Sequence, residues 1–367
     1  MKIRVEQSEL SDACSWTTRT LPARPTIPVL AGVRIGAEEG GLHLATFDME
    51  TAAKVHVDAV VDEPGTVVVS GRLLADIAKA LPKQPVELTL EGSRLSLRCG
   101  RSSFGLPTMP VEEYPELPAF PVEAGSLPGS EFGVAIAQVA VAASRDDTLP
   151  VLTGIRVELE GDTITMAATD RYRLAVRRLA WSPDDTSISR QVLVKGKQLA
   201  DLGRTLGEGD SVSLSLGDPE SGLIGFSSPD REVVTRLLHG DFPDYRRLLP
   251  KDSQTVAETD REELIESVKR VKLVAAERTT PIRLTFSDDE VLLRAGAGDD
   301  ASASESLECS VSGDPIEIAF NPDYLLDGLQ SIPNEKVTLA FTEPRKPAVL
   351  SDGPDYQYLL MPMRLGN

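Results

Sequence analysis

The sequence is poor in cysteine, histidine and aromatic residues. Its 367 residues include 3 cysteines and 3 histidines, and 5% are aromatic. Cys14, Cys99 and Cys309 are odd in number and far apart, so neither a disulfide framework nor a Cys-x-x-Cys zinc site is indicated. No apolar run approaches the ~20 residues that a membrane helix needs, and the first residues lack the apolar core of a signal peptide. We therefore expect a cytoplasmic protein.

Candidate catalytic groups are equally scarce. His43, His56 and His239 have no Cys, His or Asp partner at metal-ligand spacing, so structural histidines are favoured over metal ligands. Four acidic pairs lie in turn-like stretches, which favours solvated turns; an acidic site assembled in the fold stays open as an alternative. The pairs are Asp146-Asp147, Asp184-Asp185, Asp288-Asp289 and Asp299-Asp300.

Two glycine-containing segments resemble parts of nucleotide-binding loops. Residues 196–198 (GKQ) lack the upstream glycine and the Ser or Thr of a phosphate loop. Residues 296–298 (GAG) have no third glycine and no helical pattern after them, so they are not a dinucleotide fingerprint. With no catalytic constellation left, we predict a non-enzymatic chain with no metal and no cofactor.

What the sequence does contain is a long repeat. PVLAGVRI at residues 28–35 returns as PVLTGIRV at residues 150–157, and a degenerate copy begins at Pro281. After each copy, an apolar strand leads into a helix that contains a Leu-x-Asp motif. The aspartates of the three motifs are Asp76, Asp201 and Asp327. Solenoid units are only 20–50 residues long, so a repeat of this length is a domain. The chain is therefore predicted to contain three similar domains in tandem.

Each domain is predicted to be of the α+β class, with two helices backed by antiparallel sheets. Apolar periodicity places the helices at 7–20, 72–81, 130–143, 197–206, 261–276 and 322–331. Ser70 is the expected N-cap of the second helix, and Asn321 with Pro322 begins the last. Turn-rich segments around 121–129 and 250–254 separate the domains. The expected domains are 1–122, 127–251 and 252–367.

The net charge of −19 argues against nucleic-acid binding over the whole surface of the protein. Positive charge is nevertheless concentrated in a few segments. Lys and Arg gather on three helical segments: Arg72, Lys79 and Lys83; Lys195, Lys197 and Arg204; Lys269, Arg270 and Lys272. Solvated helix faces would explain these groups equally well. If the domains place the helices on one surface, the groups form a track for phosphates without base readout.

Five motifs carry a resemblance to a known family. They are RPTIPVL at 24–30, LPVLTG at 149–154, ATDRYRLA at 168–175, FPDYRRLLP at 242–250 and YLLMPMRL at 358–365. In this combination and order, they resemble the bacterial sliding clamp, the β subunit of DNA polymerase III, along essentially the whole chain. The resemblance implies a non-catalytic processivity factor that encircles duplex DNA, slides without sequence preference and tethers the polymerase.

The resemblance also implies an assembly. Two chains would close head to tail into a ring of six domains, with the helices facing a central hole. Two sets of residues follow from it. The implied dimer interface consists of Phe104, Leu106, Leu273 and Val274, and the implied DNA contacts are Arg24, Arg72, Lys79, Lys197 and Arg204.

A pocket for short peptides is implied in the second and third domains. Its partners would be the polymerase III α subunit, the clamp loader and other proteins that carry clamp-binding peptides. The pocket residues would be Leu152, Thr169, Arg171, Arg173, Leu174, Pro243, Arg247, Leu248, Leu359, Met361, Pro362, Met363 and Arg364. Flexible methionines suit a surface that accepts several peptides, and Pro362 favours a sheet edge.

Departures from the family pattern leave alternatives open. Pro150 and Val151 stand where some family members have aromatic residues that touch DNA, so we assign them no DNA contact. The helix at 322–331 carries Asp323 and Asp327 but no Lys or Arg, so the positive surface of the third domain is expected to come from the helix at 261–276 alone. A specialised second clamp copy, a three-domain scaffold that does not encircle DNA, and a hydrolase with a dispersed acidic site are the other readings.

Overall fold

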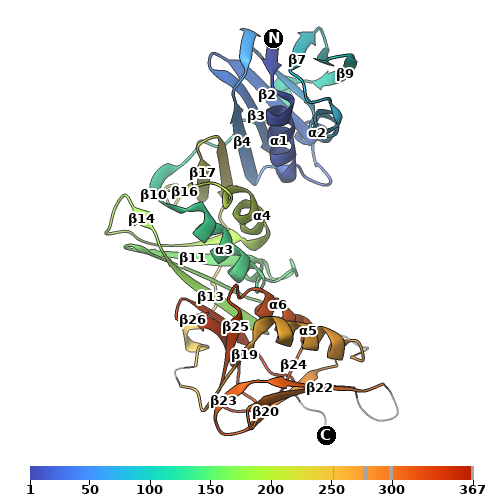
Figure 1. The fold of residues 1–367 in the computed structure, drawn as a ribbon. Helices are drawn as coiled ribbons and strands as arrows, with labels where there is room; N and C mark the ends of the chain where they lie inside the picture. The colour runs from blue at the N-terminus through green and yellow to red at the C-terminus, as the bar shows by residue number, and fades with distance from the viewer. Residues whose placement is uncertain (251, 276–279, 297–300, 365–367) are drawn as a thin grey trace. The chain divides into compact units, whose positions relative to one another are not determined.

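The chain forms two compact units in a computed structural model that describes all residues except 251, 276–279, 297–300 and 365–367 (Figure 1). The first unit comprises Met1–Gly129 and Glu208–Leu237. The second comprises Ser130–Gly207 and Leu238–Asn367. The antiparallel strand pairing and separate helices of both units confirm the predicted α+β class.

Six α-helices form within the described residues. They are α1 (Gln7–Thr17), α2 (Gly71–Ala80), α3 (Gly129–Ala140), α4 (Gly196–Leu206), α5 (Arg261–Lys272) and α6 (Pro322–Gln330). All lie where the periodicity predicted them. The expected end of the fifth helix at residue 276 lies outside the described residues. Within those residues, no helix combines the length and the apolar character that crossing a bilayer requires.

The two predicted helix caps have different outcomes. Asn321 accepts hydrogen bonds from the backbone amides of Asp323 and Tyr324 at 2.9 and 3.3 Å, which confirms it as the N-cap of α6. Ser70 is the N-cap residue of α2, as predicted, but its side chain makes no capping hydrogen bond. Ser70 is the last residue of a strand and pairs with Gly32, and this pairing fixes its backbone in the sheet.

The sheet of the first unit is antiparallel throughout. Its strands are β1 (Lys2–Val5), β2 (Gly32–Glu38), β3 (Gly41–Phe47), β4 (Thr51–Val57), β5 (Val60–Glu63), β6 (Gly65–Ser70), β7 (Val86–Glu91), β8 (Arg94–Cys99), β9 (Ser102–Met109), β10 (Val122–Pro128), β16 (Ser211–Leu216), β17 (Leu223–Ser228) and β18 (Arg231–Arg236). Their order is β10-β16-β17-β18-β4-β3-β2-β6-β9-β8-β7-β1-β5. Helix α1 lies against α2, β3 and β4 (Figure 1).

One sheet thus contains strands from two of the predicted domains. β18 pairs with β4 from Arg231↔Val55 to Thr235↔Thr51. The expected boundary at residues 122–127 lies inside β10. Pairing of β18 with β4 protects a strand edge that would otherwise be open to other chains. The repeat therefore marks three similar stretches of the sequence, while the hydrogen bonds between β18 and β4 join the second stretch to the first.

The second unit contains two antiparallel sheets. Their strands are β11 (Gly154–Glu160), β12 (Thr163–Thr169), β13 (Arg173–Ala180), β15 (Ser189–Lys195), β19 (Thr255–Asp260), β20 (Ile282–Ser287), β21 (Glu290–Ala295), β22 (Ala303–Glu308), β23 (Ser310–Gly313), β24 (Ile316–Phe320), β25 (Lys336–Phe341), β26 (Ala348–Gly353) and β27 (Tyr356–Leu360). The short strand β14 (Ser182–Pro183) belongs to neither of these sheets. A nine-stranded sheet has the order β15-β11-β12-β13-β27-β26-β25-β19-β23, and a four-stranded sheet has the order β22-β21-β20-β24.

The helices of this unit pack closely. A side-chain carbon added to Gly133 of α3 would lie 2.9 Å from the carbonyl oxygen of Gly203 in α4, so only glycine allows this approach. Helices α5 and α6 contact each other, and α5 also contacts β21 and β22 (Figure 1). Pairing of β13 with β27 brings residues 173–177 beside residues 356–360, and this pairing builds the site described next.

Candidate peptide pocket and nucleic-acid surface

A cavity of about 480 Å³ lies in the second unit. Its volume falls in the range of small-ligand pockets, and most of its lining side chains are apolar. The lining residues are Leu149, Pro150, Val151, Leu152, Thr169, Arg171, Arg173, Leu174, Asp241, Pro243, Leu248, Pro347, Leu359 and Met361. Because they come from five separated segments, the cavity exists only in the folded chain.

The floor of the cavity is part of the apolar core. Leu174 of β13 and Leu359 of β27 are direct cross-strand partners, and both are buried. They belong to a cluster with Ala167, Val176 and the ring of Tyr245. Cross-strand apolar pairs of this kind stabilise a sheet, so the floor is fixed by the fold before any ligand arrives.

The turn at residues 170–172 forms part of the rim. Asp170 Oδ1 accepts hydrogen bonds from the backbone amides of Tyr172 and Arg173 at 3.0 and 3.1 Å. Arg171 has a φ of 80°, a conformation that is uncommon for a residue with a side chain and often marks functional sites. The amide of Met361 donates to the Tyr172 carbonyl at 2.9 Å, which ties the C-terminal segment to this turn.

Arg173 places a buried positive charge behind the rim. Its Nε donates to Asp170 Oδ2 at 2.9 Å and its Nη1 to Asp327 Oδ2 at 2.5 Å. The guanidinium also lies 4.4 Å from the ring centre of Tyr324. Burial alone would lower the pKa of Arg173, but Tyr358 and these carboxylates outweigh burial and raise it. The guanidinium therefore stays charged, with a carboxylate partner at both Nε and Nη1.

Most of the expected pocket residues line this cavity. Those found there are Leu152, Thr169, Arg171, Arg173, Leu174, Pro243, Leu248, Leu359 and Met361. Arg247, Pro362, Met363 and Arg364 are not among the lining residues. Arg247 Nε instead lies 2.7 Å from Asp244 Oδ2, and the amide of Met363 donates to the Ala319 carbonyl at 2.8 Å.

Five lining residues were not predicted. Leu149, Pro150 and Val151 stand in the LPVLTG motif, so the repeat itself marks this segment. Asp241 directly precedes the FPDYRRLLP motif, but nothing in the sequence distinguishes it. Pro347 precedes β26 in a segment without any motif, and only the three-dimensional fold brings it to the cavity.

The expected DNA contacts are all exposed side chains: Arg24, Arg72, Lys79, Lys197 and Arg204. Arg204 forms an ion pair with Asp201 on its own helix, and Arg72 reaches the carbonyl of Pro22 at 3.4 Å. Within the described part of the chain, Arg24, Lys79 and Lys197 show no ion pair, so they are available to an external anion.

The positive charges on α5 are engaged differently. Lys269 lies 2.6 Å from Glu266 on its own helix, Arg270 pairs with Glu305 on β22, and Lys272 pairs with Asp323 on α6. This helix was expected to supply the positive surface of the third domain. Each cation already has a carboxylate partner, so α5 offers less free positive charge than its sequence suggests.

Comparisons with known proteins identify the family. Models for the N-terminal, central and C-terminal domains of the DNA polymerase III β subunit match residues 1–118, 126–244 and 246–364. A β sliding clamp of Streptomyces coelicolor is 51% identical, with 100% of both chains covered. The chain belongs to the β sliding clamp family.

Two further relatives are informative. The β sliding clamp homologue GriR of Streptomyces muensis is 41% identical and covers 99% of both chains. The solved sliding clamp of Pseudomonas aeruginosa bound to griselimycin superposes with a TM-score of 0.92 at 30% identity, over 100% of both chains. The expected three-domain clamp fold and the expected role, a non-catalytic processivity subunit of DNA polymerase III, are those of this family.

The residues expected at the clamp's dimer interface differ in exposure. Leu273, just after α5, is 84% exposed, and Phe104 on β9 is 40% exposed. Val274 is half-buried. Leu106 is 1% exposed, so its side chain belongs to the core of the first unit rather than to its surface. Phe104 and Leu106 are two residues apart on β9 and therefore lie on the same face of the strand, but only Leu106 is covered.

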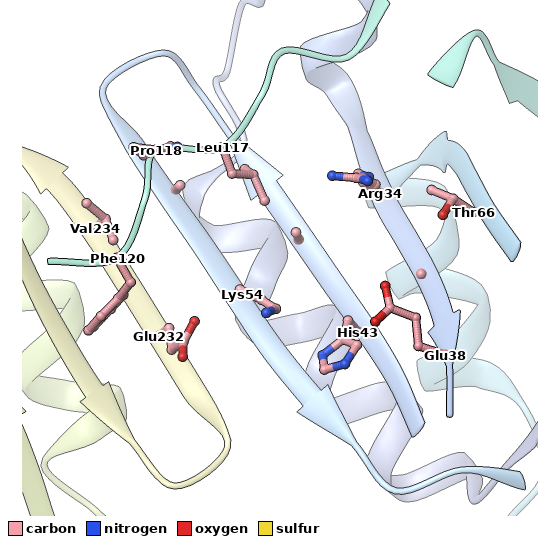
Figure 2. Close-up of a pocket in the computed structure, with 13 residues that line it drawn as sticks. Arg34, Glu38, His43, Lys54, Thr66, Leu117, Pro118, Phe120, Glu232 and Val234 are labelled. Atoms are coloured by element: carbon pink, nitrogen blue, oxygen red, sulfur yellow. The ribbon is translucent and has the colours of Figure 1, made fainter. Parts of the chain in front are cut away.

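The first unit of this clamp contains a second cavity, of about 320 Å³ (Figure 2). Figure 2 shows Lys54 and His43 on neighbouring strands, between the carboxylates of Glu38 and Glu232. Burial, followed by the nearby Lys54 and His56, holds the pKa of His43 below its usual value. Among the described residues, no group of three or more His, Cys, Asp or Glu side chains could hold a metal ion.

Proposed function

We propose that two copies of this chain close head to tail around duplex DNA and tether the replicative polymerase through the cavity of the second unit. The partners would be the polymerase III α subunit, the clamp loader and other proteins that carry a clamp-binding peptide. The observation that carries the proposal is the apolar cavity lined by Leu152, Leu174, Leu248, Leu359 and Met361, in a chain that matches the clamp family from end to end.

The exposed cations support contact with DNA phosphates. Lys79 near the end of α2 and Lys197 at the start of α4 are free of ion pairs within the described residues. Phosphate contacts carry no sequence information, so a ring that uses only such contacts can slide. Sequence-specific contacts would instead hold the ring at one site.

The exposed strand β9 and the end of α5 support ring closure. Residues 102–106 of β9 pair with β8 on one side, and pairing with β6 is confined to Thr108 and Met109 in the described residues. Phe104 and Leu273 are both apolar and exposed. Two different surfaces that meet head to tail make a heterologous interface, which closes into a ring when the rotation per subunit allows it.

Two measurements on the full-length protein test this function. The mass in solution should be that of a dimer at micromolar concentration, and loaded protein should stay on circular DNA but leave linear DNA. Leu273→Asp should give folded monomers that are not retained. A monomeric wild-type protein, or equal retention on both DNA forms, would contradict the ring.

A further inference from the structure

A buried carboxylate lies behind the wall of the cavity. Glu158 on β11 is 1% exposed, although carboxylates are rarely buried without partners. Its Oε2 accepts a hydrogen bond from the Tyr245 hydroxyl at 2.9 Å, and Arg246 donates to both carboxylate oxygens, with Nη1 3.3 Å from Oε1. Arg156 Nε lies 2.6 Å from Oε1, an ion pair without hydrogen-bond geometry.

These partners belong to the segment that forms one wall of the cavity. Tyr245–Arg247 is a short 3-10 turn, and Pro243 and Leu248 on either side of it line the cavity. The amide of Leu248 donates to the carbonyl of Tyr245 at 2.9 Å, so the place of Leu248 follows that of Tyr245. The Tyr245 ring also packs under Leu174 and Leu359 of the cavity floor.

The segment has few other anchors. Between the end of β18 at Arg236 and the start of β19 at Thr255, no strand forms in the described residues. A segment without ladder hydrogen bonds depends on side-chain contacts for its position. Burial, followed by the bond to Glu158, raises the pKa of Tyr245 to about 12, so its hydroxyl remains a donor at neutral pH.

A carboxylate suits this place better than any neutral group. It accepts from a hydroxyl and a guanidinium at the same time, and bonds with a charged partner are the stronger class. The backbone of Glu158 is held by pairing with Thr165 and Gln191 on both sides, so its side chain is a fixed point. The turn at residues 245–247 is thereby attached to a strand that is paired on both sides within the sheet.

We infer that Glu158 is a positioning residue of the peptide pocket: through Tyr245 and Arg246, it sets where Pro243 and Leu248 meet a bound peptide. The inference rests on the proposed peptide-binding function. Glu158 itself does not line the cavity, so it acts only through the turn.

The test compares Glu158→Gln, Tyr245→Phe and the double variant in the full-length protein. The probe is a fluorescent peptide copied from the C-terminal tail of the polymerase α subunit. Each single variant should weaken binding about tenfold, mainly through faster dissociation. The double variant should be scarcely weaker than Glu158→Gln alone, because the bond that Tyr245→Phe removes is one of those that Glu158→Gln already weakens. Amide exchange should quicken at residues 243–248 and not in β11.

Two controls separate the failure modes. Glu160→Gln changes an exposed carboxylate on the same strand and should leave affinity unchanged. Met361→Ala removes a lining side chain directly. If Met361→Ala weakens binding while Glu158→Gln and Tyr245→Phe do not, the positioning role is wrong and the pocket stands. If Met361→Ala also leaves affinity unchanged, the proposed pocket itself is wrong.

Additive losses in the double variant would show two separate structural effects and overturn the inference. Should Glu158→Gln fail to fold, Tyr245→Phe alone decides.

Discussion

The cavities of the two units differ in whether their charged side chains form ion pairs. In the second unit, the buried guanidinium of Arg173 is paired with Asp170 and Asp327, and the remaining walls are mainly leucine, proline and methionine. In the first unit, the cavity is lined by several charged side chains, and two of them, Lys54 and Glu232, show no ion pair within the described residues.

This difference shows that volume alone does not make a binding site. Apolar burial contributes roughly 25 cal/mol for each Å² removed from water, so an apolar cavity can retain a peptide side chain. Unpaired charges must first lose water, and that penalty is recovered only by a ligand with matching charges. The lining of the second unit's cavity therefore suits apolar side chains better than the charged lining of the first unit's cavity does.

The largest expected effect comes from removing apolar contact in the second unit. Met361 and Leu248 are 41% and 50% exposed, so shortening both should leave the core intact. The double change Met361→Ala and Leu248→Ala should weaken binding of the polymerase-tail peptide about a hundredfold, as for central anchor residues of an interface. Fluorescence anisotropy measures this affinity.

The matched control is Met49→Ala in the first unit. Met49 is 45% exposed and lines neither cavity. Its replacement should change neither peptide affinity nor dimer mass. Equal losses in the control and in the double variant would mean that exposed apolar residues act nonspecifically, and the contrast between the cavities would disappear.

A second contrast concerns free and paired cations. If Lys197 contacts a phosphate, Lys197→Ala should reduce the slope of log affinity against log salt by about 0.9. Lys272→Ala should change the slope much less, because its ammonium already pairs with Asp323. Titration of duplex DNA between 50 and 200 mM salt measures both slopes, a range over which such contacts dominate binding. Equal changes in the two variants would show that the ion pair on α5 opens when DNA binds.

The sequence predicts the backbone elements better than the pairing of charges. Helix positions follow from apolar periodicity, which is local, and Asn321 caps α6 through its immediate neighbours. The ion pair between Lys272 and Asp323 joins residues 51 positions apart. Nothing local distinguishes Lys272 from Lys197, which shows no ion pair in the part of the chain that the structure describes, so from the sequence both count as free cations.

The candidate site shows the same limit. Leu174 and Leu359 could be assigned because both stand in motifs of a recognisable family. Pro347 has no motif, and Glu158 lies within an ordinary strand pattern, so neither could be found before the fold placed them. Leu106 was assigned to the dimer interface from the resemblance alone, and its burial in the first unit depends on packing that the sequence does not show.

The next expected result is an absence of effect. Arg34→Ala and Lys54→Ala remove the cations of the first unit's cavity. Both should leave peptide affinity unchanged and alter the unfolding free energy by no more than about 0.5 kcal/mol, as is usual for surface substitutions. Loss of peptide binding in either variant would mean that the charged cavity also holds part of the ligand.

The smallest expected effect is a pH dependence in that charged cavity. Burial, Lys54 and His56 lower the pKa of His43 more than Glu38 and Glu232 raise it. The unfolded chain, with an ordinary histidine pKa near 6.5, therefore binds more protons than the folded chain just below that pH. Stability must then fall as the pH falls through this value. His43→Gln removes the titrating group, so the melting temperature of this variant should drop less than that of the wild type between pH 7.5 and 5.5.

The control is His239→Gln, which changes an exposed histidine outside both cavities and should retain the wild-type drop. A His43→Gln protein with the full wild-type drop would show that His43 is as well solvated as it is in the unfolded chain, and that the first cavity does not disfavour its charge.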